Sequence, residues 1–181
     1  RSAMSEYQYY EWQTVDRLLT GAEQDAVSQL SSHIDVTASQ AVVTYDWSDF
    51  KHDPRKVLAR YFDAHLYFAN WGTRILMFRF PAGWLDEALV APCLVEDMIQ
   101  LSTEGKSRIL EFSFEEEPEW DNFEGELSGL VGLRNDLLGG DSRCLYLGWL
   151  KALSLLSADQ GRPAKAAEYA ARIAPEAAPA K

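Results

Sequence analysis

The sequence predicts an α+β fold: a mixed, largely antiparallel sheet with helices on one face and a C-terminal helical hairpin. Strand-like and helix-like patterns alternate as far as Pro81 in the order β-α-β-α-β-β. Two more strand patterns flank a short turn at residues 103–106, and two helical segments follow in the last third. A ferredoxin-like variant is one topology compatible with this order.

Two helix starts divide the first half of the chain. Thr20 and Glu23 have the spacing of a capping box, in which each side chain accepts from the other residue's backbone N–H. Asp53 precedes Pro54, which is typical of an N-cap followed by proline at the first helical position. Residues 40–47 alternate in polarity, which predicts a strand with Trp47 on the same face as Tyr45. The expected strands are 5–15, 40–47, 64–69 and 74–80, and the expected helices are 20–32 and 54–63.

Glycine and aspartate mark the boundary between the two later helices. Gly139-Gly140 ends the first helix and Asp141 caps the second. The second helix has an apolar stripe at helical spacing, which predicts its buried face: Leu145, Trp149, Ala152 and Leu156. The expected elements are a helix at 83–91, strands at 97–102 and 107–114, and helices at 123–138, 142–157 and 164–173.

Composition indicates one domain in a cytoplasmic protein. Of the 181 residues, 47% are hydrophobic, which is enough for a sizeable core. Residues 1–3 precede Met4 and are interpreted as a cloning remnant, residues 4–158 as a single α+β domain, and residues 159–181 as an Ala/Pro-rich short helix and flexible tail. Neither a signal peptide nor a membrane-spanning pattern is evident. Cys93 and Cys144 lie in apolar contexts, which favours reduced, buried thiols.

The net charge of −11 disfavours direct binding to nucleic acid or to an anionic membrane. Acidic residues are concentrated at 111–126, where aromatic residues including Trp120 are interleaved with them. One interpretation is a solvated loop that keeps the protein soluble. The other is a docking surface for a basic partner, or a mimic of nucleic-acid charge.

Motifs for dinucleotide binding, phosphate binding and the common nucleophile or zinc chemistries are missing from the sequence, so we expect no cofactor. One polar group stands out between residues 46 and 65. Aspartate and histidine together are suitable ligands for Mg, Mn, Fe or Zn, and Asp49 and His52 are the weak metal candidates. Capping by Asp53 and a solvated loop explain the same residues structurally. The group comprises Asp46, Asp49, His52, Asp53, Asp63 and His65.

The expected turn at residues 70–73 is a second candidate site. Trp71 and Arg74 are residue types enriched at interaction hot spots, and Arg74 suits an anion. The structural alternative is that Trp71 covers the end of the sheet while Arg74 pairs with Asp63 or Asp46.

Long runs of the chain resemble a family of uncharacterised bacterial proteins. They are SEYQYYEWQTVDR (5–17), YDWSDFKHDP (45–54), RYFDAHLYFANWGTRILMFRFP (60–81) and LRNDLLGGDSRCLYLGWL (133–150). The resemblance covers roughly residues 5–150 and implies neither an activity nor a functional residue. It also implies that family members continue beyond this length with a helix-rich part.

Two functions from different classes therefore stay open. The first is a non-enzymatic protein-interaction domain, an adaptor or assembly module that binds another protein, possibly a basic one, through exposed aromatic residues. The alternative is a metal-dependent hydrolase or ligand-binding domain that uses the Asp/His cluster at 46–65. The candidate binding residues are Trp47, Asp49, His52, Asp63, His65, Trp71, Arg74 and Trp120.

Overall fold

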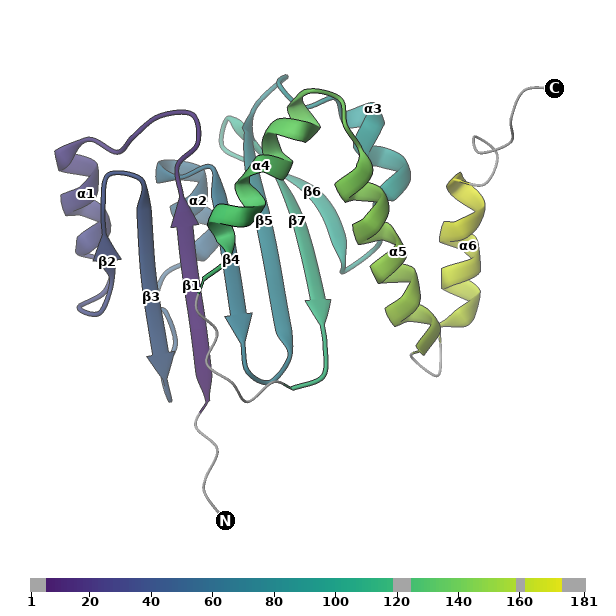
Figure 1. Ribbon diagram of the computed structural model, residues 1–181, viewed down its shortest axis with the longest axis horizontal. Helices are drawn as coiled ribbons and strands as arrows, with labels where there is room; N and C mark the ends of the chain where they lie inside the picture. Colours follow the sequence, from purple (N-terminus) through teal and green to yellow (C-terminus); the bar gives the residue numbers. More distant parts are fainter. Residues whose placement is uncertain (1–5, 119–124, 159–161, 174–181) are drawn as a thin grey trace, which may run out of the picture.

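A computed structural model describes residues 6–118, 125–158 and 162–173 of the chain (Figure 1). Residues 1–3, Trp120 and the tail after residue 173 lie outside the described residues. The strands are β1 (Tyr7–Gln13), β2 (Asp35–Val36), β3 (Gln40–Asp46), β4 (Ala64–Ala69), β5 (Thr73–Pro81), β6 (Ile99–Glu104) and β7 (Ser107–Glu115). The helices are α1 (Gly21–Ser28), α2 (Pro54–Tyr61), α3 (Glu87–Val90), the 3-10 helix η1 (Ala91–Cys93), α4 (Leu127–Leu138), α5 (Arg143–Ala158) and α6 (Pro163–Ile173).

The described strands form one seven-stranded sheet in the order β2-β3-β1-β4-β5-β7-β6. Every pair of neighbouring strands is antiparallel. The first six elements follow the order β-α-β-β-α-β, and β1 lies between β3 and β4, so that half of the sheet has the split arrangement of ferredoxin-like domains. The α+β class is thereby confirmed. Strand β2 was not expected from the sequence, and β5, β7 and β6 extend the sheet on one side.

The helices cover both faces of the sheet, and not one face as the sequence predicted. Figure 1 shows α4 crossing the front of the sheet while α2 lies behind it. Val57 and Leu58 of α2 pack with Trp12 in one core cluster. Leu127 of α4 and Leu145 of α5 pack in a separate cluster on the opposite face. The helical hairpin therefore adds a third layer to the domain.

Strands β1 and β4 are buried on both faces because they lie between these two helical layers. Tyr10 and Trp12 face the α1/α2 layer, whereas Tyr9 and Glu11 face the α4 side; all four side chains are buried. This arrangement explains why residues 5–15 show no clean alternation of polarity.

Local capping signals agree with the observed element boundaries. The side chain of Thr20 accepts from the N–H of Glu23 and the carboxylate of Glu23 accepts from the N–H of Thr20, which confirms the capping box. Asp53 caps α2 through the N–H of Arg55. Helix α1 ends at Ser28, earlier than expected. The predicted stripe of α5 is buried at all four positions. No helix in the described ranges combines the length and apolarity that crossing a bilayer requires.

Candidate functional site

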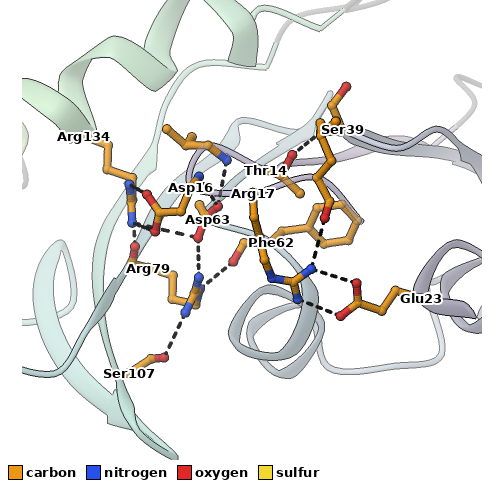
Figure 2. A network of polar contacts seen from close by, with 12 residues as sticks. Thr14, Asp16, Arg17, Glu23, Ser39, Phe62, Asp63, Arg79, Ser107 and Arg134 are labelled. Carbon is orange, nitrogen blue, oxygen red and sulfur yellow. Dashed lines mark hydrogen bonds and ion pairs between the residues drawn. The ribbon is translucent and has the colours of Figure 1, made fainter. Parts of the chain in front are cut away.

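Asp63 is buried beside the start of β4 and lies in a network of charged side chains (Figure 2). One carboxylate oxygen accepts the backbone N–H groups of Val15 and Asp16 at 2.7 and 2.9 Å, and the other pairs with Arg79. Burial on its own would raise the pKa of Asp63, but the two backbone donors and Arg79 lower it below the ordinary value. The carboxylate is thus held ionised by protein groups on both oxygens.

Arg134 completes this network from α4, and sequence reasoning missed it. Its side chain is fully buried and donates to both carboxylate oxygens of Asp16 at 2.8 Å, while Nε donates to the carbonyl of Arg79 at 2.8 Å. A signal was present in the sequence. Arg134 falls on the apolar stripe of α4 between Leu127 and Leu137, a position where an unpaired charge is costly.

His65 is buried within the α1/α2 core cluster and stacks on Trp12 with ring centroids 4.6 Å apart. Its Nδ1 lies 2.9 Å from the carbonyl oxygen of Glu11, to which a neutral ring protonated at Nδ1 donates. Burial lowers the pKa of His65 to about 3, against the opposite effect of this hydrogen bond. His65 is therefore a neutral core residue near pH 7.

Asp49 lies on the loop after β3 and is anchored to β1. Its carboxylate accepts from Nε2 of Gln8 at 2.8 Å, and the Oε1 of Gln8 accepts the hydroxyl groups of Tyr10 and Tyr67, each at 2.8 Å. Burial and the charge of Asp49 raise the pKa of Tyr10 to about 12. Asp49 also lines a polar cavity of about 460 Å³.

His52 lies on the same loop and is exposed. The centroid of its ring is 5.5 Å from that of Phe50.

The two Asp/His groups lie at opposite ends of the sheet. Asp49 contacts Gln8, whereas the backbone of Asp63 donates to the carbonyl of Gln13. Gln8 and Gln13 are separated by about 17 Å along an extended strand, far beyond the reach of ligands to a single ion. In the part of the chain that the structure describes, no three His, Cys, Asp or Glu side chains are grouped to hold a metal ion.

Trp47 leaves the strand instead of continuing its inner face as predicted. Strand β3 ends at Asp46, and Trp47 has a φ of 67°, in the left-handed region that bulky residues rarely occupy. Its side chain is 61% exposed. The indole therefore does not pack on the core cluster beside Tyr45 as predicted. The left-handed backbone conformation costs energy that the surrounding contacts must offset.

Trp71 is exposed on the turn between β4 and β5. Its indole N–H donates to the hydroxyl of Thr73 at 3.1 Å, and that hydroxyl donates to the carboxylate of Glu115. Gly72 has a φ of 119°, and a Cβ there would lie 2.1 Å from the carbonyl oxygen of Glu116. Only glycine fits this turn, so the position of Trp71 is fixed by close packing of the backbone.

Arg74 makes neither of the pairs suggested by the sequence, with Asp63 or with Asp46. Its Nη1 donates to the carbonyl of Ala69 at 2.9 Å, and its guanidinium lies over the ring of Phe68 at 3.8 Å. Nε is 3.9 Å from the carboxylate of Glu116. These contacts hold Arg74 on the α4/α5 side of the sheet.

The two exposed tryptophans share one end of the sheet because both loops are tied to the start of β1. The N–H of Trp47 donates to the carbonyl of Glu6 at 3.3 Å, and the N–H of Tyr7 donates to Oδ1 of Asn70 at 3.1 Å. Strand β1 lies between β3 and β4, so the loops emerge about 10 Å apart. Exposed carboxylates at this end include Glu6, Asp46 and Glu115. We define the tryptophan edge as Glu6, Asp46, Trp47, Trp71 and Glu115.

The acidic segment 111–126 is neither a loop throughout nor a continuous aromatic surface. Its first residues belong to β7, where Phe112 is buried and Phe114 packs against the same core cluster. Glu111 pairs with Arg55, and Glu116 pairs with Lys151. Trp120 lies outside the described residues.

No family model matches the chain, and neither a curated protein nor a solved structure shows significant similarity to it.

Proposed function

We propose that this domain is a non-enzymatic protein-interaction module, an adaptor or assembly unit, that binds a basic partner at the tryptophan edge. One observation carries the proposal: Trp47 and Trp71 are exposed by 61% and 41% at the same end of the sheet. Tryptophan is the side chain most enriched at binding hot spots, where one large apolar surface is buried at little cost in conformational entropy.

The backbone of both tryptophans is held rigidly before any partner arrives. Trp47 has a left-handed conformation beside a hydrogen bond to Glu6, and Trp71 precedes a glycine packed against Glu116. A preorganised anchor loses less conformational entropy on binding than a mobile one. Backbone strain at an exposed tryptophan also supports a role in function, since strained residues are concentrated at functional sites.

The charge around the edge favours a basic partner. Glu6, Asp46 and Glu115 are exposed beside the tryptophans, and the whole chain carries a net charge of −11. Complementary charge accelerates association and makes it sensitive to salt. We therefore expect a partner surface with Lys or Arg around one or two apolar pockets.

A cytoplasmic location is part of the same proposal. Cys93 and Cys144 are both free thiols. Reduced cysteines agree with a compartment in which glutathione and thioredoxin prevent disulfide formation.

Capture of partners by matched tryptophan variants tests the proposal. The immobilised domain is exposed to a lysate of the source organism, and bound proteins are quantified by mass spectrometry. The double variant Trp47→Ala/Trp71→Ala should lose the specific partner. Trp84→Ala is the matched control, because Trp84 is 56% exposed but lies beyond the other end of β5. The affinity of the purified partner should fall at least tenfold in the double variant, and should fall with salt in the wild type.

Two results would contradict the proposal. One is a partner that binds the double variant as tightly as it binds the wild type. The other is equal loss of the partner in Trp84→Ala, since that would indicate general stickiness of exposed tryptophan and not a defined surface.

A further inference from the structure

A cavity of about 290 Å³ lies between α2 and the turn that joins β6 to β7. Three exposed cations line it, namely Lys56 and Arg60 of α2 and Lys106 of the turn. Within the described ranges none of the three forms an ion pair, although most of the Lys and Arg side chains there do. We call these three residues the basic cluster. It concentrates uncompensated positive charge on a chain whose net charge is −11.

The lining of this cavity suits an aromatic ring that is accompanied by carboxylates. Ala59 lines it together with Lys56 and Arg60, whose long side chains have apolar hydrocarbon stems. Its volume exceeds the roughly 150 Å³ of a cavity that admits benzene, so there is room for one indole ring. Lysine and arginine are also attracted to the face of a tryptophan ring. Glu104 is the one carboxylate among the described lining residues, so cations outnumber it.

The basic cluster and the tryptophan edge lie at opposite ends of the sheet. Strand β7 begins at Ser107, which lines the cavity, and ends at Glu115, which belongs to the edge. The nine residues of this strand span about 27 Å. In Figure 1 the arrows of β3 and β7 both point to the lower end of the sheet, where the edge lies. Both surfaces of one copy can therefore be occupied at the same time.

We propose that the basic partner of the tryptophan edge is a second copy of this chain, which presents its basic cluster. The inference rests on the proposed function and names the partner of that same site. The edge has exposed indoles among the carboxylates of Glu6, Asp46 and Glu115, and the cluster has cations around a cavity of matching size. Unlike surfaces of identical chains join head to tail, so successive copies form a ring or a filament.

The overall repulsion between two acidic chains does not prevent such a contact. At about 0.15 M ionic strength the Debye length is about 8 Å, so charges on remote parts of the two chains are largely screened from one another. Carboxylates and cations that meet across the interface lie well within this distance. Local complementarity therefore outweighs the net charge.

Sedimentation velocity of the full chain tests the inference with two variants. The edge variant is Trp47→Ala/Trp71→Ala, and the cluster variant is Lys56→Glu/Lys106→Glu. From about 10 µM to about 0.5 mM the wild type should form species larger than a dimer, and each variant alone should stay monomeric. An equimolar mixture of the two variants should form a 1:1 dimer, because one retains the cluster and the other retains the edge. Such a dimer also demonstrates that both variants are folded.

Single charge reversals provide the matched control. Lys51 and Lys106 are both exposed and form no ion pair within the described residues, but Lys51 lies on the loop after β3, outside the cluster. Lys106→Glu should weaken the self-association by roughly tenfold. Lys51→Glu should leave it unchanged. Equal weakening by both reversals would show that only the net charge matters, and it would overturn the assignment to the cluster.

Three further results would overturn the inference. They are a wild-type chain that stays monomeric, a variant that self-associates alone as the wild type does, and a mixture of the two variants that stays monomeric. Lysate capture separates these failures from a failure of the proposed function. A second copy binds an immobilised domain at either end, so the domains for capture carry the cluster variant, which leaves the edge alone available. Tryptophan-dependent capture of a different protein by a monomeric chain would support the proposed function and overturn this inference only.

Discussion

At the scale of single residues, Trp47 has the most unusual conformation for its side-chain type. Its φ of 67° and its exposure of 61% mean that the chain holds a bulky residue in a strained conformation without burying it. Glycine relieves such strain, whereas alanine keeps it. We therefore predict that Trp47→Gly is more stable than Trp47→Ala by about 1 kcal/mol, the reverse of the usual order at ordinary positions.

Urea unfolding of the two variants measures this difference directly. The comparison is clean because both variants remove the same indole, so that only the backbone preference differs between them. Equal stability, or a more stable alanine variant, would show that the left-handed conformation is absent in solution. The support that strain gives to the tryptophan edge would then be lost.

His65 gives a prediction about pH. Its pKa in the folded state is lowered to about 3 from an ordinary value of 6.5, so below pH 6.5 the unfolded chain binds a proton that the folded chain does not. The stability that the neutral ring contributes is complete above pH 6.5 and is lost progressively as the pH falls toward 3. The loss is about 1.4 kcal/mol per pH unit for one proton.

Substitution isolates this contribution from those of the carboxylates. The free energy of unfolding is measured at several pH values between 7.5 and 4.5 in the wild type and in His65→Gln, which lacks the titrating ring. Whatever the absolute stability of the variant, its slope against pH should be shallower by about one proton. Identical slopes would mean that His65 is protonated in the folded protein or is not buried.

At the scale of elements, most boundaries follow from signals that are local in the sequence. The capping box at Thr20, the Asp53-Pro54 start of α2 and the glycine pair after α4 each act within a few residues. The apolar stripe of α5 is similarly local, because its period of 3.6 residues is visible without any partner. These elements could therefore be predicted from the sequence.

Loop conformation could not be predicted in the same way. Residues 40–47 alternate through Trp47, so the pattern gives no sign that the strand ends at Asp46 and that the indole turns outward. The turn at Gly72 depends on contact with Glu116, a residue that is distant in the sequence. The two components of the tryptophan edge are consequently defined by tertiary contacts, and sequence reasoning found the residues without their arrangement.

At the scale of the whole molecule, the candidate site depends on the order of the strands. Placing β1 between β3 and β4 brings the loops of Trp47 and Trp71 to the same end, and it moves Asp49 and Asp63 to opposite ends. The local sequence of a strand does not indicate which other strands pair with it in the sheet. The burial of both faces of the sheet could likewise not be predicted, because the sequence of an amphipathic helix does not indicate which face of a sheet the helix covers.

The network around Arg134 joins these layers and gives a prediction about the whole fold. Arg134 of α4 binds Asp16 beyond the end of β1, and Asp63 before β4 binds Arg79 of β5, so four charges connect the helical layer to the sheet. Asp63 is 2% exposed and Arg134 is fully buried. Removing one member leaves the others with uncompensated buried charge, which typically costs about 3–5 kcal/mol.

We predict that Asp63→Asn and Arg134→Gln each lower the free energy of unfolding by several kcal/mol, whereas Arg17→Gln lowers it by at most about 1 kcal/mol. Arg17 is the matched control because its ion pair with Glu23 has good geometry at 2.6 Å but is solvent-exposed. Because the network is one unit, the double variant Asp63→Asn/Arg134→Gln should cost less than the sum of the single variants. Strict additivity in urea unfolding would show that the two residues act separately, and α4 would then be attached to the sheet by apolar packing alone.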